Sequence, residues 1–272
     1  ACRLSSDAGG ASFVVRGRGP NILIPPGRWR QIIRAGRGAA LSFEVFVLSD
    51  GVWERYRPVV LTVAHDEIDP YLVYRLIPPI HNTWYEMRIM ERCLENFRER
   101  PVYFARPSVR MKSICINCHS FPQRDPSALT IHTRGDITTT IIATGSGISR
   151  TDMSAKMVYT CWHPDRSVIA FSTNRVRQVF HMARTEIRDV IDEDSDLGLY
   201  ILESNSFLSD PAIARPDRLE TYPCWAPDGK TLFFSSAPRL FDSLAEIETQ
   251  VFREIRYDLM KVAYDPGTRR FG

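Results

Sequence analysis

Two segments of this 272-residue chain repeat each other position by position, and this repeat limits the fold more than any other feature. Residues 160–174 read TCWHPDRSVIAFSTN, and residues 223–237 read PCWAPDGKTLFFSSA. In both, a Trp ends one run, a turn with Pro-Asp follows, and a run of alternating residues begins. Alternation with a period of two is typical of a strand with one buried face, so each segment predicts a β-hairpin. Further strand-like runs follow the two hairpins at 196–201 and 257–262.

Repeated hairpins followed by further strands predict four-stranded blades of a β-propeller. A weaker third copy covers residues 117–133, with a longer turn. This alignment makes Cys118, Cys161 and Cys224 equivalent, and it gives His119 the place of a Trp. We expect about three blades, fewer than the roughly four to eight of a closed propeller. Bare sheet edges invite pairing, so we expect either a piece of a longer protein or assembly through open propeller edges.

The first hundred residues predict a separate strand-rich domain with short helices. Residues 41–48 alternate, Asp50-Gly51 suits a tight turn, and residues 52–63 return as the partner strand. The remaining predicted elements are a helix over 26–35 that ends at Gly36, a helix over 83–94 and an extended linker over 97–110. The chain is therefore expected to be mainly β, with an N-terminal β-rich domain over 1–108 and partial propeller blades over 109–272.

The chemistry of the chain is concentrated in Cys115-Ile-Asn-Cys118-His119, the attachment pattern of a c-type haem. Two thiols at this spacing can form thioethers with one porphyrin, and the next imidazole can bind its iron. A redox dithiol and half of a zinc site are the alternatives. A thioredoxin-like dithiol needs a βαβ context, and zinc needs four ligands where no second Cys-x-x-Cys exists. The pattern therefore predicts one covalently bound haem c, with His119 as the proximal iron ligand.

The second axial ligand is predicted among three histidines, ranked His181, His163 and His132. His181 ranks first because it lies in residues 174–185, an insertion that a blade does not require, and long loops more often carry function. The same histidines also suit turn or core positions, and an open sixth position is a further alternative. Met153, Met157 and Met182 are weaker candidates. Haem propionates are expected to pair with Arg134, Arg175 or Arg177, for which solvent exposure is the alternative.

Composition excludes some classes of function. The formal net charge is only +3, with Lys and Arg scattered among acids, so no nucleic-acid surface is expected. Six cysteines are too few for a disulfide scaffold, although Cys161 and Cys224 would pair if their blades lie close. Ala1-Cys2 resembles the end of a lipoprotein signal, which predicts a lipid anchor at Cys2, with an unmodified surface Cys as the alternative.

The chain resembles the TolB-like β-propeller proteins with an embedded c-type haem motif. The resemblance is carried by Ile24-Pro-Pro, residues 43–53, 68–77, 95–97 and 115–121, His132-x-Arg-Gly135, Trp162-His-Pro, residues 178–181 and 195–197, and Tyr222-Pro-Cys-Trp-Ala-Pro-Asp-Gly229. It implies an exported, often lipid-anchored propeller that is usually longer than this chain. Arg166, where the turn prefers Gly, departs from the pattern, as do Cys161 and Cys224.

Three functions follow as alternatives. The first is a monohaem carrier that transfers electrons to a redox partner protein. It would work outside the cytoplasm, in the periplasm or the extracellular space. The sequence lacks three common catalytic motifs: a nucleophile elbow, a phosphate-binding Gly-rich loop and a zinc-protease helix motif. A propeller module for protein interaction or ligand sensing, with a structural or sensory haem, is the second. A peroxidase-like enzyme, which needs an open distal site, is the third.

Overall fold

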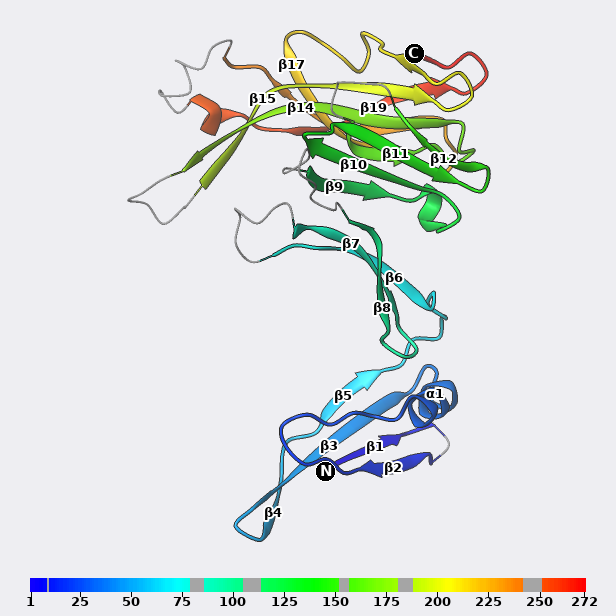
Figure 1. Ribbon diagram of the computed structural model, residues 1–272, viewed down its shortest axis with the longest axis vertical. Helices are drawn as coiled ribbons and strands as arrows, with labels where there is room; N and C mark the ends of the chain where they lie inside the picture. Colours follow the sequence, from blue (N-terminus) through cyan, green and yellow to red (C-terminus); the bar gives the residue numbers. More distant parts are fainter. Residues whose placement is uncertain (9, 79–85, 105–113, 152–156, 181–187, 242–250) are drawn as a thin grey trace. The chain divides into compact units, whose positions relative to one another are not determined.

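The computed structural model describes residues 1–272 except 9, 79–85, 105–113, 152–156, 181–187 and 242–250 (Figure 1). The described chain is mainly β. It divides into two compact units, residues 1–74 with 89–102 and residues 75–88 with 103–272. The predicted boundary at residue 108 falls among the undescribed residues 105–113. Unlike the predicted second domain, the second unit also takes in residues 75–88.

The first unit contains the predicted hairpin and the first predicted helix. Its main sheet has the order β2-β1-β3-β4, and β5 also pairs with β3. Asp50 and Gly51 have φ angles of 51° and 80°, as a two-residue hairpin turn requires. The backbone N–H of Gly36 donates to Ile32 at 2.9 Å and ends the helix where predicted. The bounds are β1 (Cys2–Ser6), β2 (Ser12–Val15), α1 (Pro26–Ala35), β3 (Ala40–Ser49), β4 (Val52–Arg55) and β5 (Val59–Thr62).

Two sequence-based predictions for residues 83–110 are wrong where the structure describes them. Instead of a helix and a linker, the chain forms β7 (Arg88–Cys93) and β8 (Glu99–Phe104), which join β6 (Tyr71–Leu76) in a sheet of order β6-β7-β8. β7 is the central strand, so both of its neighbours supply backbone hydrogen bonds. Ile89 and Met90 are consecutive and both buried. Pairing with the strands on either side thus outweighed the local pattern that suggested a helix.

Cys2 lies in β1 with its side chain buried, beside Leu4 and Leu41 in the core of the first unit. Burial raises the pKa of its thiol. A lipid on this sulfur would require the side chain to leave that core. None of the described helices is long and apolar enough to cross a membrane.

The second unit contains the predicted blades as three four-stranded sheets, each formed by strands consecutive in the chain (Figure 1). This confirms the blade interpretation of the repeat. Blade 1 contains β9 (Ile114–Ser120), β10 (Leu129–Gly135), β11 (Thr139–Thr144) and β12 (Gly147–Arg150). Blade 2 contains β13 (Val158–Trp162), β14 (Val168–Phe180), β15 (Arg188–Ile201) and β16 (Ser206–Leu208). Blade 3 contains β17 (Arg218–Trp225), β18 (Thr231–Pro238), β19 (Asp258–Asp265) and β20 (Arg270–Phe271), and short 3-10 turns occur at Pro122–Arg124 and Val251–Glu254.

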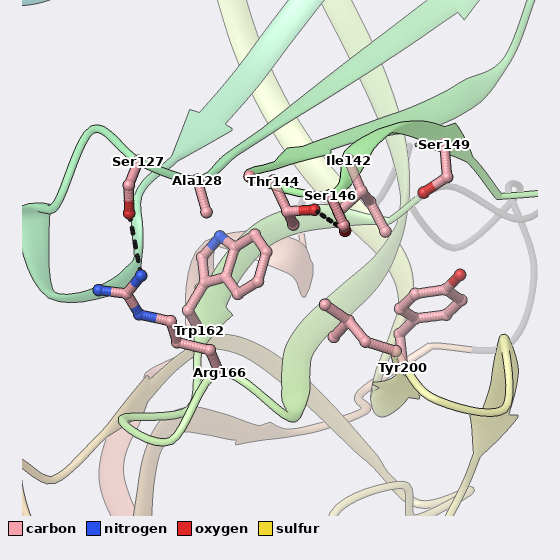
Figure 2. Close-up of a pocket in the computed structure, with 11 residues that line it drawn as sticks. Ser127, Ala128, Ile142, Thr144, Ser146, Ser149, Trp162, Arg166 and Tyr200 are labelled. Carbon is pink, nitrogen blue, oxygen red and sulfur yellow. Dashed lines mark hydrogen bonds between the residues drawn. The ribbon is translucent and has the colours of Figure 1, made fainter.

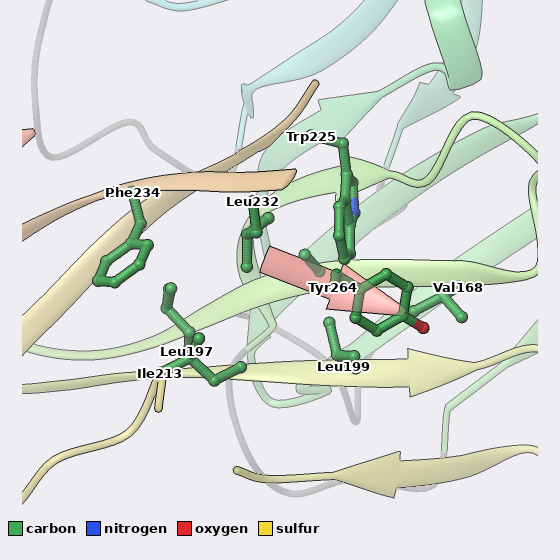
Figure 3. Packing of buried hydrophobic residues seen from close by; sticks show 9 residues of the cluster. Val168, Leu197, Leu199, Ile213, Trp225, Leu232, Phe234 and Tyr264 are labelled. Atoms are coloured by element: carbon green, nitrogen blue, oxygen red, sulfur yellow. The ribbon is translucent and has the colours of Figure 1, made fainter. Parts of the chain in front are cut away.

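Blades 2 and 3 share one apolar core (Figure 3). Trp225 lies in it, with its ring centroid 4.8 Å from that of Tyr264. Leu199 and Leu232 are completely buried there. Burial of this much apolar surface explains why the two blades pack together, since the hydrophobic effect scales with the area removed from water.

The first strand of every blade carries a β-bulge, which in blade 1 lies one residue further from the following turn than in blades 2 and 3. The register shifts between Ile116 and His119 in β9, where His119 pairs with Ile131. The corresponding shifts end at Cys161, opposite Ala170, and at Cys224, opposite Phe233. The turn after each strand gives the equivalence, because the Asp125 N–H donates to the Pro122 carbonyl as the Arg166 N–H does to His163 and the Gly229 N–H does to Ala226. His119 lies three residues before this turn, whereas Trp162 directly precedes its own, so His119 does not take the place of a Trp.

The positions of the tryptophans belong to another residue of blade 1. Ser120 pairs with Thr130, as Cys161 pairs with Ala170 in blade 2, so the next residue, Phe121, takes the place of Trp162. The alignment from sequence was therefore displaced by two residues, because the longer turn of blade 1 hides the register. The Ser120 hydroxyl contacts Thr130 at 2.7 Å and Thr160 of blade 2 at 2.8 Å.

Strands β14 and β15 continue past the blade as a two-stranded ribbon (Figure 1). Their pairing runs from Val168 opposite Ile201 to Phe180 opposite Arg188. The insertion predicted over 174–185 is thus an extension of two strands as far as Phe180. His181 lies outside the described residues.

Candidate haem attachment site

The cysteine motif lies on β9, the first strand of blade 1, where Cys115 and Cys118 are both half-buried. Residues three apart on a regular strand point to opposite faces. Here Cys115 pairs with Arg134, while the bulge places residues 117 and 118 together opposite His132. Arg134 and His132 are two residues apart on β10 and share a face. The bulge therefore brings both thiols to one face of the sheet.

Arg134 lies beside the first thiol of the motif. Burial raises the pKa of Cys115, while the charge of the Arg134 guanidinium and its hydrogen bond to the thiol act in the opposite direction. Arg75 also lowers this pKa, and the Cys118 thiol raises it slightly. Of the three arginines predicted to pair with propionates, Arg134 is the one that the register places next to the motif.

His119 has the chemical form that an iron ligand needs. Burial and then the charge of Arg75 lower its pKa, so the ring is neutral at pH 7. Its ring stands edge-on to Phe121, with centroids 6.0 Å apart.

His119 pairs with Ile131, however, and so lies on the face opposite to the thiols. For the imidazole to reach the face of the thiols, residues 117–119 would have to leave the ladder with β10, in which His119 is paired in this structure. The donor types fit a covalently attached haem, namely two accessible thiols on one face and a neutral imidazole next in the chain.

His132 lies on β10 with its side chain fully buried. Its Nδ1 lies 3.0 Å from the Thr140 hydroxyl. Because Ile131 is the partner of His119, the adjacent His132 is on the opposite face of the sheet. The sheet therefore lies between these two imidazoles, and the structure does not bring them together at one site.

His163 is engaged in the contact between blades 2 and 3. Its Nε2 lies 2.9 Å from the carbonyl oxygen of Gly229, and its Nδ1 lies 2.7 Å from Asp165. The ring stands edge-on to Trp225, with centroids 4.8 Å apart. Both nitrogens thus contact protein atoms, which leaves neither for a metal in this arrangement. The His163 side chain thus connects a turn of blade 2 to the turn of blade 3 that contains Gly229.

The other predicted partners are distributed away from the motif or lie outside the described residues. Arg175 and Arg177 both form ion pairs with Glu193 across the ribbon, so their guanidinium groups already have a carboxylate. Met157 is completely buried in the core of blades 1 and 2. Met153 and Met182, like His181, fall among undescribed residues. Within the described ranges, no group of three or more His, Cys, Asp or Glu side chains could hold a metal ion.

Sequence reasoning missed a pair of tyrosines in the bulges of blades 2 and 3. Tyr159 and Tyr222 have left-handed φ angles of 50° and 55°, and their ring centroids are 4.3 Å apart. Burial and a hydrogen bond with Tyr222 raise the pKa of Tyr159, and the Cys118 thiol contributes to the rise. Tyr159 therefore lies near the second thiol of the motif. The repeat itself was the available indication, because both tyrosines occupy the same repeat position.

A pocket of about 500 Å³ opens between blades 1 and 2 (Figure 2). Its walls include Trp162 and Tyr200, and the Trp162 indole N–H has no hydrogen-bond partner among the described residues. At its rim Arg166 donates to Ser127 at 2.9 Å and also pairs with Asp125. Arg166 has a φ of 65°, close to the 70° of Gly229 in blade 3, so it takes the turn conformation that glycine would favour.

Known proteins resemble this chain in structure only. No family model and no curated protein matches it. Among solved structures, dipeptidyl peptidase 4 from Porphyromonas gingivalis aligns at 10% identity and a TM-score of 0.41, over 85% of this chain and 30% of that one. A dipeptidyl aminopeptidase IV from Bacteroides ovatus aligns at 12% identity and a TM-score of 0.35, over 77% and 28%. TolB from Acinetobacter baumannii aligns at 11% identity and a TM-score of 0.29, over 92% and 71%. The chain thus spans less than a third of the two peptidases.

Proposed function

We propose that this chain is a monohaem c-type cytochrome on TolB-like propeller blades, which transfers electrons outside the cytoplasm. The observation that carries the proposal is the bulge in β9, which brings Cys115 and Cys118 to one face beside Arg134. The next residue, His119, is a neutral imidazole. A bound haem c would supply one-electron chemistry at its iron.

Each residue of the motif has a separate task in this proposal. Cys115 and Cys118 hold the macrocycle through thioethers, so retention does not depend on deep burial. His119 supplies the proximal nitrogen, and Arg134 neutralises a propionate through its guanidinium. The half-buried position of both thiols keeps the attachment face near solvent, where a redox partner protein can approach. Thioether attachment takes place outside the cytoplasm, which agrees with the proposed periplasmic or extracellular location.

The test is whether purified full-length chain carries one covalent haem after export from a cell that matures c-type cytochromes. We expect haem that acid acetone does not extract from the wild type and does extract from a Cys115→Ala/Cys118→Ala variant. Cys93→Ala is the matched control, because Cys93 lies in the first unit. Colourless protein with free Cys115 and Cys118 thiols would contradict the proposal, as would zinc bound at these sulfurs.

Ligand sensing, with a structural or sensory haem, is a second candidate that two observations favour. His132 and His163 are both engaged within the blades, which favours an open or weakly held sixth position. The pocket between blades 1 and 2 has on its wall the indole N–H of Trp162, which has no hydrogen-bond partner in the described part of the chain. A low-spin spectrum indifferent to cyanide and carbon monoxide would favour electron transfer. A high-spin spectrum that shifts when either ligand is added would favour sensing or a peroxidase-like activity.

A further inference from the structure

We propose that Cys161 and Cys224 form a disulfide that links blade 2 to blade 3. The inference does not depend on haem, because these cysteines lie outside the attachment motif. Sequence reasoning made the bond conditional on the two blades being adjacent and close. The structure meets that condition.

The two cysteines occupy the same position on neighbouring first strands. Each is the first residue after the bulge of its strand, opposite Ala170 for Cys161 and opposite Phe233 for Cys224. The backbone N–H of Trp225 donates to the Sγ of Cys161 at 3.5 Å. Since Trp225 directly follows Cys224, this bond holds one sulfur against the backbone of the other cysteine. The Tyr159–Tyr222 ring contact fixes the same two strands beside each other.

The surroundings of the two thiols indicate which of them reacts first with an oxidant. Cys161 is half-buried, and burial raises its pKa, with a further contribution from its hydrogen bond with the Cys224 thiol. Cys224 is exposed, so it is the sulfur that an oxidant reaches first.

The oxidant is a small-molecule disulfide. The Cys224 thiolate attacks one of its sulfurs, forms a mixed disulfide and releases one small thiol. The Cys161 thiolate then attacks the Cys224 sulfur and releases the second small thiol. The protein loses two electrons and two protons, and the small disulfide gains both.

The bond would fasten two blades whose first strands pack through side chains and are not paired in one sheet. It would close a loop of about 60 residues and reduce the conformational entropy of the unfolded chain.

The experiment treats the folded full-length chain with oxidised glutathione, blocks the remaining thiols with N-ethylmaleimide and digests the product with trypsin without reduction. Cleavage after Lys and Arg places Cys161 in peptide 157–166 and Cys224 in peptide 219–230. Cys115 and Cys118 fall together in peptide 113–124, so the state of the haem motif is measured separately in the same digest.

We expect one linked species of peptides 157–166 and 219–230, which disappears in Cys161→Ser and Cys224→Ser and persists in the control Cys93→Ser. The oxidised wild type should unfold about 5 °C or more above the reduced protein, a shift that both single variants lose. Recovery of both peptides alkylated from folded, oxidised protein would overturn the proposal. A link from either cysteine to any other one would also overturn it.

Discussion

Arg134 and Cys115 face each other across the ladder of β9 and β10, and the guanidinium lowers a thiol pKa that burial raises. A thiol must be deprotonated to react as a nucleophile. The arginine therefore keeps the first sulfur of the motif more reactive than its half-buried position alone would allow.

Replacing Arg134 with Gln should slow the alkylation of Cys115 in haem-free protein at pH 8 and move the rate profile to higher pH. The physical reason is the loss of a positive charge and a hydrogen bond beside the thiolate. Mass spectrometry of peptide 113–124 over time measures the rate. Arg175→Gln is the control, because Arg175 pairs with Glu193 on the ribbon. An equal rate in both variants would contradict the assigned contact.

Removing the imidazole of His163 should destabilise the fold by about 2–4 kcal/mol, since it leaves a cavity and an unpaired carbonyl at Gly229. The haem spectrum should not change, because both ring nitrogens already contact protein atoms. Denaturant unfolding and optical spectroscopy of His163→Ala give the two measurements. Loss of a low-spin spectrum in this variant would show that His163 binds iron.

His181→Ala gives the complementary test of the predicted distal ligand. If His181 binds the iron, this variant should lose the low-spin spectrum, while His132→Ala should retain it. A spectrum that changes in His132→Ala alone would reverse the ranking made from the sequence. It would also mean that His132 leaves its contact with Thr140 when haem is attached.

Glu220 should make stability depend on pH. Its side chain is 1% exposed, and burial raises its pKa to about 7, with the nearby Asp196 adding to the rise. In the unfolded chain the group ionises near pH 4.5, so the folded state holds the proton more tightly. Stability should therefore fall as the pH rises from about 4.5 to about 7, by up to about 3 kcal/mol, and then level off. Unfolding free energies of wild type and Glu220→Gln between pH 5 and 8 measure this, and parallel curves would refute it.

The shared core of blades 2 and 3 should be sensitive to truncation at Leu199. This side chain is completely buried, whereas Leu259 is 78% exposed. Leu199→Ala should cost about 2–5 kcal/mol and Leu259→Ala under about 0.5 kcal/mol, as chemical denaturation would measure. Similar losses in the two variants would mean that the blades do not share the described core.

Local patterns predicted elements whose information lies within a few residues. The hairpin at Asp50-Gly51 follows from two residues that accept positive φ, and the helix over 26–35 follows from its apolar spacing and its end at Gly36. The blades followed from the repeat of a Trp, a turn and an alternating strand. Residues 88–93 were misassigned because their strand depends on β6 and β8, which no local pattern reveals.

The candidate site was predictable in composition but not in geometry. The spacing of Cys115, Cys118 and His119 named the residues, yet the bulge decides which faces they occupy. A bulge and a longer turn change the pairing without changing the composition, so the alignment was displaced by two residues, with His119 matched to Trp162 where the structure has Phe121. The ion pairs of Arg175 and Arg177 also depend on Glu193, a partner from another strand.

A bulge interrupts the pairing of the first strand in each of the three described blades. It holds residues 117–118 in blade 1, Tyr159 and Thr160 in blade 2, and Tyr222 and Pro223 in blade 3. Regular pairing resumes after each of them. The side chains held at this point therefore differ from blade to blade while the neighbouring strands keep their pairing, so one framework presents groups of different chemistry.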